Sequence, residues 1–356
     1  MEAGTVFERD VRISPTMEKE NICWHDVDQP PFRIYGVQKE NGKYRRMAEE
    51  SAKGVSELVY RLHTNTAGGR IRFVTDSAYV AIHAEMDGIS RLSHFAFTGS
   101  AGMDLYAVED GVDRYIRTII PPMDMQAGFE EVIDLPGRKE RLLTVNLPLY
   151  SNVNRLYIGL EKQAVVKRAP DYVCEKPFVT YGSSITQGGC ASRPGCTYQA
   201  FLTRWMDWDH INLGFSGSAR GEDEMTEWIC NLDMNVFILD YDHNAPSVEH
   251  LAATHERMFW AVRAAHPQLP IIIFPRPKFC LDAEEQQRLA VIRATYEHAV
   301  ETGDQNVFFL DGKELLQGIE ADGTVDSGHP NDGGFYCMAR ALLPVLQKIQ
   351  QTSMEG

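Results

Sequence analysis

Two segments far apart in the sequence carry residues whose types and spacing suit covalent catalysis. Segment 178–188 begins as an apolar, β-branched run and then turns at small polar residues, so we expect Ser184 just past the end of a buried strand. Asp326 precedes His329 by three residues, which lets the carboxylate accept the imidazole Nδ1–H and leaves Nε2 to act as a base. A hydroxyl, an imidazole and an orienting carboxylate are what acyl transfer requires. The alternatives are a turn serine and a capping or surface histidine.

Two further loops could supply hydrogen-bond donors for the negative oxygen that such a reaction creates. Segment 212–218 is rich in glycine, and Gly217 would offer its backbone N–H. Segment 240–246 follows another apolar run and would place the Asn244 amide at the same rim. With the Ser184 N–H, these donors would form an oxyanion hole, in which losing one donor typically costs about 2.7–4 kcal/mol. The alternatives are that glycine is needed at position 217 only for its backbone angles, and that Asn244 only caps a turn.

Four more residues are weaker candidates for substrate contact. Arg276 stands between two prolines at the end of a predicted strand, and a solvated loop charge is the alternative. His243 is either a ligand or a wall residue beside Asn244. Asp104 and Tyr106 either build the first domain or reach the active site if that domain packs over it.

The second half of the chain must position the catalytic residues, and there compact apolar runs alternate with helical patterns. This alternation predicts a mostly parallel sheet covered by helices, with right-handed crossovers. Beyond the run at 178–182, the predicted strands are 211–215, 236–241, 269–274 and 307–310, and the predicted helices are 195–208, 222–230, 248–265, 283–302 and 334–351.

The first half of the chain is typical of a β domain with polar turns. Residues 109–111 are Glu-Asp-Gly, a hairpin turn with glycine where a positive φ would be needed. Many short strands with few helices predict a β-sandwich or jelly roll. The predicted strands are 31–36, 69–75, 80–84, 104–108, 114–119, 142–147 and 155–160. A charged, proline-containing linker follows, so we expect domains at 1–165 and 166–356.

Composition narrows the classes of partner. The 356 residues carry a formal net charge of −15, and phosphate binding needs clustered Lys and Arg, so we expect neither nucleic acid nor membrane as a partner. The N-terminus lacks the apolar core of a signal peptide and no run is long enough to span a bilayer, which favours the cytoplasm. Seven scattered cysteines without zinc-like spacing indicate reduced thiols, and we expect no metal and no cofactor.

The blocks YGSSITQG, NLGFSGS, DYDHNA and DSGHP resemble, in order and spacing, the four signature blocks of the SGNH (GDSL-type) hydrolases. The resemblance implies the flavodoxin-like three-layer α/β/α fold of that family. It assigns Ser184 as nucleophile, Gly217 and Asn244 as oxyanion donors, and Asp326 and His329 as the remaining triad members. Upstream, residues 102–106 (GMDLY) resemble the GxDLY motif of the β-rich domain found in one subgroup.

Two departures from the family pattern stand out. Ser183 occupies the place of the usual aspartate, which puts any role for that carboxylate in doubt and leaves the nucleophile intact. The third block has His243-Asn244-Ala245 instead of the common Gly-x-Asn-Asp, so Asn244 is chosen by its position after the strand.

The subgroup resemblance implies an esterase that removes short acyl groups, acetyl first, from carbohydrates or related polyols, with a small-molecule or oligosaccharide ester as substrate. Two alternatives remain: an acyltransferase with the same triad, and an inactive carbohydrate-binding protein. The acyl length, the alcohol and the oligomeric state, a homo-oligomer included, stay open.

Overall fold

The computed structural model describes residues 5, 7–8, 10–17 and 19–355, which form two compact units. The β unit comprises the described residues up to Arg46, Thr64–Asp171 and Arg193–Gly195. The α/β unit comprises Met47–His63, Tyr172–Ser192 and the described residues from Cys196 onward. The sequence predicts a single boundary, between residues 165 and 166. The structure instead places Met47–His63 in the α/β unit and Arg193–Gly195 in the β unit.

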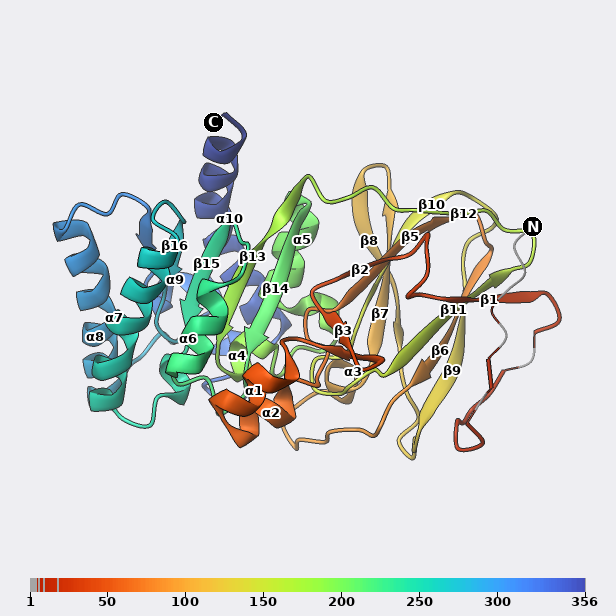
Figure 1. The fold of residues 1–356 in the computed structure, drawn as a ribbon, viewed down its shortest axis with the longest axis horizontal. Helices are drawn as coiled ribbons and strands as arrows, with labels where there is room; N and C mark the ends of the chain where they lie inside the picture. Colours follow the sequence, from red (N-terminus) through yellow and green to blue (C-terminus); the bar gives the residue numbers. More distant parts are fainter. Residues whose placement is uncertain (1–4, 6, 9, 18, 356) are drawn as a thin grey trace. The chain divides into compact units, whose positions relative to one another are not determined.

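The β unit consists of short strands and one short helix (Figure 1). Its elements are β1 (Ile22–Asp26), β2 (Arg33–Tyr35), β3 (Gln38–Glu40), β4 (Lys43–Arg45), β5 (Arg70–Thr75), β6 (Tyr79–Glu85), α3 (Phe97–Ser100), β7 (Met103–Glu109), β8 (Val112–Ile119), β9 (Gly128–Asp134), β10 (Arg141–Asn146), β11 (Arg155–Glu161) and β12 (Val166–Lys167).

Two antiparallel sheets of the β unit share one core. One sheet has the order β1-β11-β6-β9, and the other has the order β12-β5-β10-β7-β8 with β2 paired to β5. Alternate side chains such as Phe73, Ile82 and Leu143 meet in a single buried cluster, because successive residues of a strand point to opposite faces. The predicted hairpin turn is present, with positive φ at Asp110 and Gly111. An antiparallel β domain is therefore confirmed, while the jelly-roll topology stays a prediction.

The α/β unit alternates strands with helices, as its sequence pattern predicts. Its elements are α1 (Glu49–Val55), α2 (Glu57–Leu62), β13 (Cys174–Gly182), α4 (Ser184–Gln187), α5 (Tyr198–Met206), β14 (Trp208–Gly214), α6 (Asp223–Cys230), β15 (Val236–Asp240), the 3-10 turn Asp242–Asn244, α7 (Val248–Ala265), β16 (Ile271–Ile273), α8 (Ala283–Glu301), β17 (Val307–Phe309), α9 (Gly312–Leu315), the 3-10 turn Glu320–Gly323 and α10 (Asp332–Glu355).

The five strands of this unit form one parallel sheet in the order β14-β13-β15-β16-β17. This is the flavodoxin-like order, in which the first strand, β13, lies between the second and the third. Val179 and Tyr181 of β13 join the core formed with α6, α7 and α8. Thr180, between them, faces the other way and accepts a hydrogen bond from Gln199 of α5. Helices therefore cover both faces of the sheet, and the predicted parallel α/β arrangement is confirmed (Figure 1).

Helices α1 and α2 belong to the α/β unit although they precede most of the β unit in sequence. Met47, Ala52 and Val59 are fully buried in the same core as the sheet. Ser56 ends α1 and caps α2, because its side chain accepts a hydrogen bond from the Val59 N–H. The β-rich prediction for the first half of the chain missed this helical pair.

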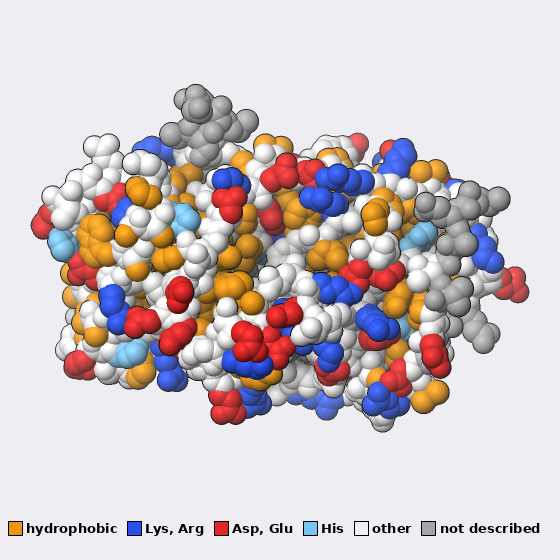
Figure 2. Space-filling view, in the orientation of Figure 1, with side chains coloured by type: hydrophobic (Ala, Val, Ile, Leu, Met, Phe, Trp, Pro, Cys, Tyr) orange, Lys and Arg blue, Asp and Glu red, His pale blue; other side chains and the backbone are white. Residues whose placement is uncertain are grey.

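In the described part of the chain, no helix combines the length and apolar character needed to cross a membrane. On the face shown in Figure 2, acidic and basic side chains lie interspersed. The expectation that nucleic acid is not a partner stays a prediction.

Candidate active site

Three of the four predicted loops meet because their strands are neighbours in a parallel sheet. β13 ends at Gly182, which pairs with Gly214 at the end of β14 and with Asp240 at the end of β15. The carboxyl ends of parallel strands form the ligand crevice of open α/β sheets. Ser184, Gly217 and Asn244 each follow one of these ends by a few residues, so the sheet itself brings their loops to one edge.

Two glycines permit the loops to approach so closely. A Cβ on Gly182 would lie 2.0 Å from the Asp240 carbonyl oxygen, and a Cβ on Gly214 would lie 2.0 Å from the Gln187 backbone nitrogen. No side chain fits at such separations, so glycine is required at both positions. The Gln187 side chain adds a further tie, since its Oε1 accepts a hydrogen bond from the Ser216 N–H at 3.0 Å.

The structure brings the three predicted triad residues together in the predicted order. His329 Nε2 lies 2.8 Å from Ser184 Oγ, and His329 Nδ1 lies 2.8 Å from Asp326 Oδ2. Both distances are those of good hydrogen bonds. Ser184 is 9% exposed and the His329 side chain is 24% exposed, so the serine is nearly buried while the imidazole reaches the surface. The arrangement can transfer a proton from the hydroxyl to the imidazole.

The turn 326–329 fixes the orienting carboxylate. Asp326 Oδ1 accepts hydrogen bonds from the Gly328 and His329 N–H groups at 3.1 and 2.7 Å, and Ser327 adopts a positive φ of 63° to close the turn. Partial burial acts to raise the pKa of Asp326, but these hydrogen bonds and the His329 ring outweigh it and hold the pKa at about 2. The carboxylate is therefore ionised at neutral pH.

Ser183, which replaces the usual aspartate, is fully buried and caps the nucleophile helix. Its hydroxyl accepts a hydrogen bond from the Ile185 N–H at 3.1 Å. Thr186, on the same turn, donates to Asp240 Oδ2 at 2.8 Å. A hydroxyl thus performs the local structural task at position 183, and the position of Ser184 does not depend on a carboxylate there.

The two predicted oxyanion loops are connected by the Asn244 side chain. Gly217 has a φ of +71°, a conformation that favours glycine. Glycine is therefore needed at this position for its backbone angles. Asn244 Nδ2 donates one hydrogen bond to the Phe215 carbonyl oxygen at 2.9 Å. Because an amide nitrogen carries two hydrogens, the second can point toward a substrate. The oxyanion role of both residues stays a prediction.

Arg276 is held inside the α/β unit. Its backbone N–H and Nε donate to Asp242, and its Nη1 donates to Glu285 at 2.9 Å. The side chain is 11% exposed. Burial acts to raise the pKa of Asp242, but Arg276 outweighs it and lowers that pKa below its usual value. These partners point to a structural task for Arg276, and direct substrate contact stays a prediction.

His243 lies in the same turn as Asn244. Its Nε2 is buried without a hydrogen-bond partner among the described residues. Burial, with the charge of Arg276 nearby, lowers the pKa of His243 to about 4, so the ring is neutral at pH 7. A neutral ring is compatible with both hypotheses, that His243 only lines the site and that it contacts the substrate.

Asp104 and Tyr106 are buried residues of β7 in the β unit, and both lie on the face of the strand opposite its core residues. Asp104 is fully buried and accepts hydrogen bonds from Asn146 Nδ2 and from the Gly195 N–H, each at 2.7 Å. Tyr106 is 3% exposed, and a Cβ on Gly195 would lie 2.5 Å from its ring. These positions favour the structural reading of the GxDLY residues, which anchor segment Arg193–Gly195 to the β unit.

Cys190 and Cys196, which follow the nucleophile in sequence, are free thiols, as are the other five cysteines. Burial raises the pKa of Cys190 to about 12. The thiol is therefore protonated at neutral pH and is a poor nucleophile.

Sequence reasoning missed two residues that the structure places at the predicted oxyanion loops. Leu58 of α2 is 39% exposed, and its Cδ2 would lie 3.9 Å from a Cβ on Gly217. Arg288 of α8 donates hydrogen bonds to the turn that carries Asn244. Neither residue lies in a motif block, and only the packing of α2 and α8 could reveal them.

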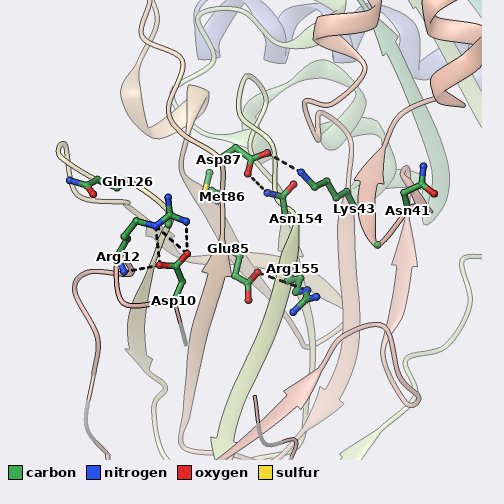
Figure 3. Close-up of a pocket in the computed structure, with 12 residues that line it drawn as sticks. Asp10, Arg12, Asn41, Lys43, Glu85, Met86, Asp87, Gln126, Asn154 and Arg155 are labelled. Atoms are coloured by element: carbon green, nitrogen blue, oxygen red, sulfur yellow. Dashed lines mark hydrogen bonds and ion pairs between the residues drawn. The ribbon is translucent and has the colours of Figure 1, made fainter. Parts of the chain in front are cut away.

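A separate pocket of about 430 Å³ lies in the β unit and contains none of the predicted site residues. Figure 3 shows its charged side chains paired with one another: Asp10 with Arg12, Glu85 with Arg155, and Asp87 with Lys43. Because acids and bases balance and satisfy each other, the pocket has no net charge to select an ion. The remaining residues that line it are Asn41, Gly42, Met86, Gln126, Ala127 and Asn154.

Comparison with known families covers both units. Residues 175–347 match the model of the GDSL-like lipase/acylhydrolase family. Residues 22–166 match the GxDLY model, which describes the N-terminus of SGNH-hydrolase-type esterases. A comparison with curated proteins gave no match.

Several solved structures share the fold along most of the chain. A protein from Bacteroides ovatus described as a GDSL-like lipase is 28% identical, with a TM-score of 0.83, over 93% of this chain and 98% of that chain. The salicylyl-acyltransferase SsfX3 from a tetracycline biosynthetic pathway is 21% identical, with a TM-score of 0.76, over 94% and 99%. A family two carbohydrate esterase from Clostridium thermocellum, in complex with cellohexaose, is 13% identical, with a TM-score of 0.58, over 89% and 98%.

The two family models follow one another along the chain, and the structure folds each matched region as a compact core of the expected class. Residues 175–347 therefore belong to the GDSL-like lipase/acylhydrolase (SGNH) family, and residues 22–166 form the N-terminal GxDLY domain of its esterases.

Proposed function

We propose that the protein is a serine esterase that hydrolyses short-chain acyl esters, acetyl esters of carbohydrates or related polyols first among them. The observation that carries this proposal is the continuous hydrogen-bonded chain Ser184–His329–Asp326, with both bonds at 2.8 Å. Its geometry is that of a nucleophile, a base and an orienting acid.

In the acylation step, Ser184 Oγ attacks the ester carbonyl carbon while its proton passes to His329 Nε2. Asp326 stabilises the imidazolium through Nδ1 and, with a pKa of about 2, remains a carboxylate throughout. The imidazolium then gives its proton to the leaving alcohol oxygen as the ester C–O bond breaks. The product of this half-reaction is the free alcohol and an acyl group on Ser184.

In the deacylation step, water takes the place of the alcohol. His329 removes a proton from the water as its oxygen attacks the acyl carbon, and then returns a proton to Ser184 Oγ. In both steps, the Ser184 and Gly217 N–H groups and the Asn244 amide would bind the negative oxygen, and such fixed donors stabilise the transition state without reorganisation.

The choice of a carbohydrate acetyl ester is supported by architecture. Family two carbohydrate esterases share the two-unit fold at low identity, and one was solved with an oligosaccharide bound. Localisation in the cytoplasm remains part of the proposal.

A panel of aryl esters graded from acetyl to octanoyl, assayed beside acetylated oligosaccharides, tests the proposal. We expect kcat/KM to be highest for acetyl and free acetate to be released from the oligosaccharides. Ser184→Ala should reduce kcat by about 10⁴-fold or more, while Ser51→Ala, in α1, should leave it unchanged. A strong preference for butyryl or longer esters, with acetylated oligosaccharides left intact, would exclude the substrate assignment.

An acyltransferase is the second candidate, because the fold resembles that of the salicylyl-acyltransferase with a TM-score of 0.76. The same acyl-enzyme would then pass its acyl group to another hydroxyl instead of water. Product analysis in the presence of an added alcohol separates the two: an esterase yields mainly free acid, whereas a transferase yields a new ester.

A further inference from the structure

The turn that carries Asn244 is short and depends on contacts from outside itself. It is a single 3-10 turn, Asp242–Asn244, whose first residue is preceded by Tyr241 without a side-chain cap. Its own hydrogen bonds are the Asn244 N–H to the Tyr241 carbonyl at 3.0 Å and the Ala245 N–H to the Asp242 carbonyl at 3.3 Å. Two bonds of this kind leave the turn weakly defined, because 3-10 geometry is poorer than that of an α-helix.

Arg288 of α8 binds this turn on both sides of Asn244. Its Nη1 donates hydrogen bonds to the carbonyl oxygens of Asp242 and Ala245, both at 3.0 Å. The side chain is 7% exposed, so water competes little for these bonds. Glu284, one turn earlier on α8, accepts from Nε and Nη2 at 3.0 and 2.8 Å and keeps the guanidinium plane oriented.

Arg276 holds the same turn through the side chain of its first residue. Asp242 is 1% exposed, and its carboxylate accepts from the Arg276 backbone N–H at 3.0 Å, from Nε at 2.8 Å and from Nη2. Glu285 binds the other face of Arg276 and also Lys278. The Asp242 backbone and side chain are therefore both fixed by arginines from separate elements.

We propose that Arg288 is a positioning residue for oxyanion stabilisation: it holds the Asp242–Ala245 backbone so that the Asn244 amide is aimed at the reacting carbonyl. The inference rests on the proposed function, because it needs Asn244 to bind the oxyanion. Its physical basis is that a donor stabilises a transition state only when its position is set beforehand, and a displacement near 1 Å can cost on the order of 100-fold in rate. Arg288 touches no substrate in this scheme.

Kinetics of single and double variants on an aryl acetate test the proposal. Asn244→Ala should lower kcat by about 10²–10³-fold. Arg288→Met should lower kcat by roughly 10–100-fold with KM almost unchanged, because ground-state binding does not use the oxyanion donor. The double variant should be no slower than Asn244→Ala alone, since Arg288 has nothing left to position. Arg293→Met, on the same helix but paired with Asp311, should keep the wild-type kcat.

Active-site titration with a serine-directed phosphonate corrects each kcat for the fraction of folded enzyme. If Arg288→Met does not fold, Arg288→Lys serves instead, because one ammonium cannot reproduce the planar fork, and the same lack of additivity with Asn244→Ala is expected. Multiplicative losses in the double variant, a wild-type kcat for Arg288→Met, or a wild-type kcat for Asn244→Ala would overturn the proposal. Failure of the proposed function looks different: the wild-type protein itself would neither cleave the ester nor react with the phosphonate.

Discussion

His329 Nε2 hydrogen-bonds to Ser184 Oγ at 2.8 Å, although 145 residues separate the two in sequence. The sheet and a helix packed on it together explain how they meet. Ser184 stands directly after β13, and the turn 326–329 stands just before α10, which packs against α5 on the same side of the sheet. The catalytic proposal depends on this one hydrogen bond between Ser184 and His329.

Asp326→Asn should leave the fold of the turn intact and reduce kcat by roughly 10²–10⁴-fold. An amide can still accept the two backbone hydrogen bonds, but it neither stabilises the imidazolium nor enforces the correct tautomer. Steady-state kinetics on an aryl acetate measure the effect, with the exposed Asp322→Asn as a matched control. An unchanged kcat in Asp326→Asn would remove Asp326 from the triad.

Arg276→Lys distinguishes the positioning of Asp242 from contact with substrate. Lysine keeps the charge but loses the forked geometry that binds Asp242 and Glu285 together. If Arg276 holds Asp242, kcat should fall on the order of tenfold while KM stays the same. A raised KM with a normal kcat would instead support the sequence-based prediction that Arg276 contacts substrate.

The free energy of unfolding should decrease as the pH falls from about 6.5 to about 4, in part because of His255. This residue is 1% exposed, and burial lowers its pKa from 6.5 to about 4. The unfolded chain therefore binds the proton before the folded protein does, so the stability is fully present above pH 6.5 and is lost as the pH drops through the folded value. The contribution is on the order of 3–4 kcal/mol once the pH is below the folded value, at about 1.4 kcal/mol per unit of pKa difference.

Chemical denaturation at pH 7.5 and pH 4.5 measures this loss. His255→Gln should reduce the difference between the two pH values, while the part due to His243, whose pKa is lowered in the same direction, remains. An equal pH dependence in the wild type and in His255→Gln would show that His255 does not titrate as described.

Gly195→Ala should destabilise the β unit. The added Cβ would lie 2.5 Å from the Tyr106 ring and 2.8 Å from the Asp104 carboxylate, and both side chains are buried and cannot move away. Overpacking of this kind typically costs about 1–3 kcal/mol. Thermal unfolding should show a lower Tm than the wild type, whereas Gly54→Ala, in α1 with its nearest atom at 3.7 Å, should not lower it. A normal Tm in Gly195→Ala would contradict the close packing.

The sequence predicted the parallel sheet well because its strands are buried on both faces. A run such as Ile271–Ile273 is apolar throughout and stands between helical patterns, which leaves few other readings. Helix α7 (Val248–Ala265) has the predicted bounds, since Ser247 caps its start and the pattern of apolar residues is regular. The triad loops could be located for the same reason, as each follows such a strand or precedes such a helix.

The residues that the sequence did not predict act through tertiary packing. Helices α1 and α2 are short and charged on their exposed side, and only Met47, Ala52 and Val59 show that they join the core of the α/β unit. Arg288 looks like an ordinary helical charge until α8 packs against the Asn244 turn. The spacing of apolar residues in the sequence predicts whether a segment is a helix or a strand. It does not predict which other element the side chains of that segment contact.

The most direct test of the esterase mechanism is the reaction of the wild-type protein with a fluorophosphonate, followed by intact and peptide mass spectrometry. We predict one adduct per chain on Ser184, no adduct in Ser184→Ala, and slow labelling in His329→Ala, because the base is needed to activate the hydroxyl. An unmodified Ser184 in folded protein, or labelling that persists at the same rate in His329→Ala, would contradict the account.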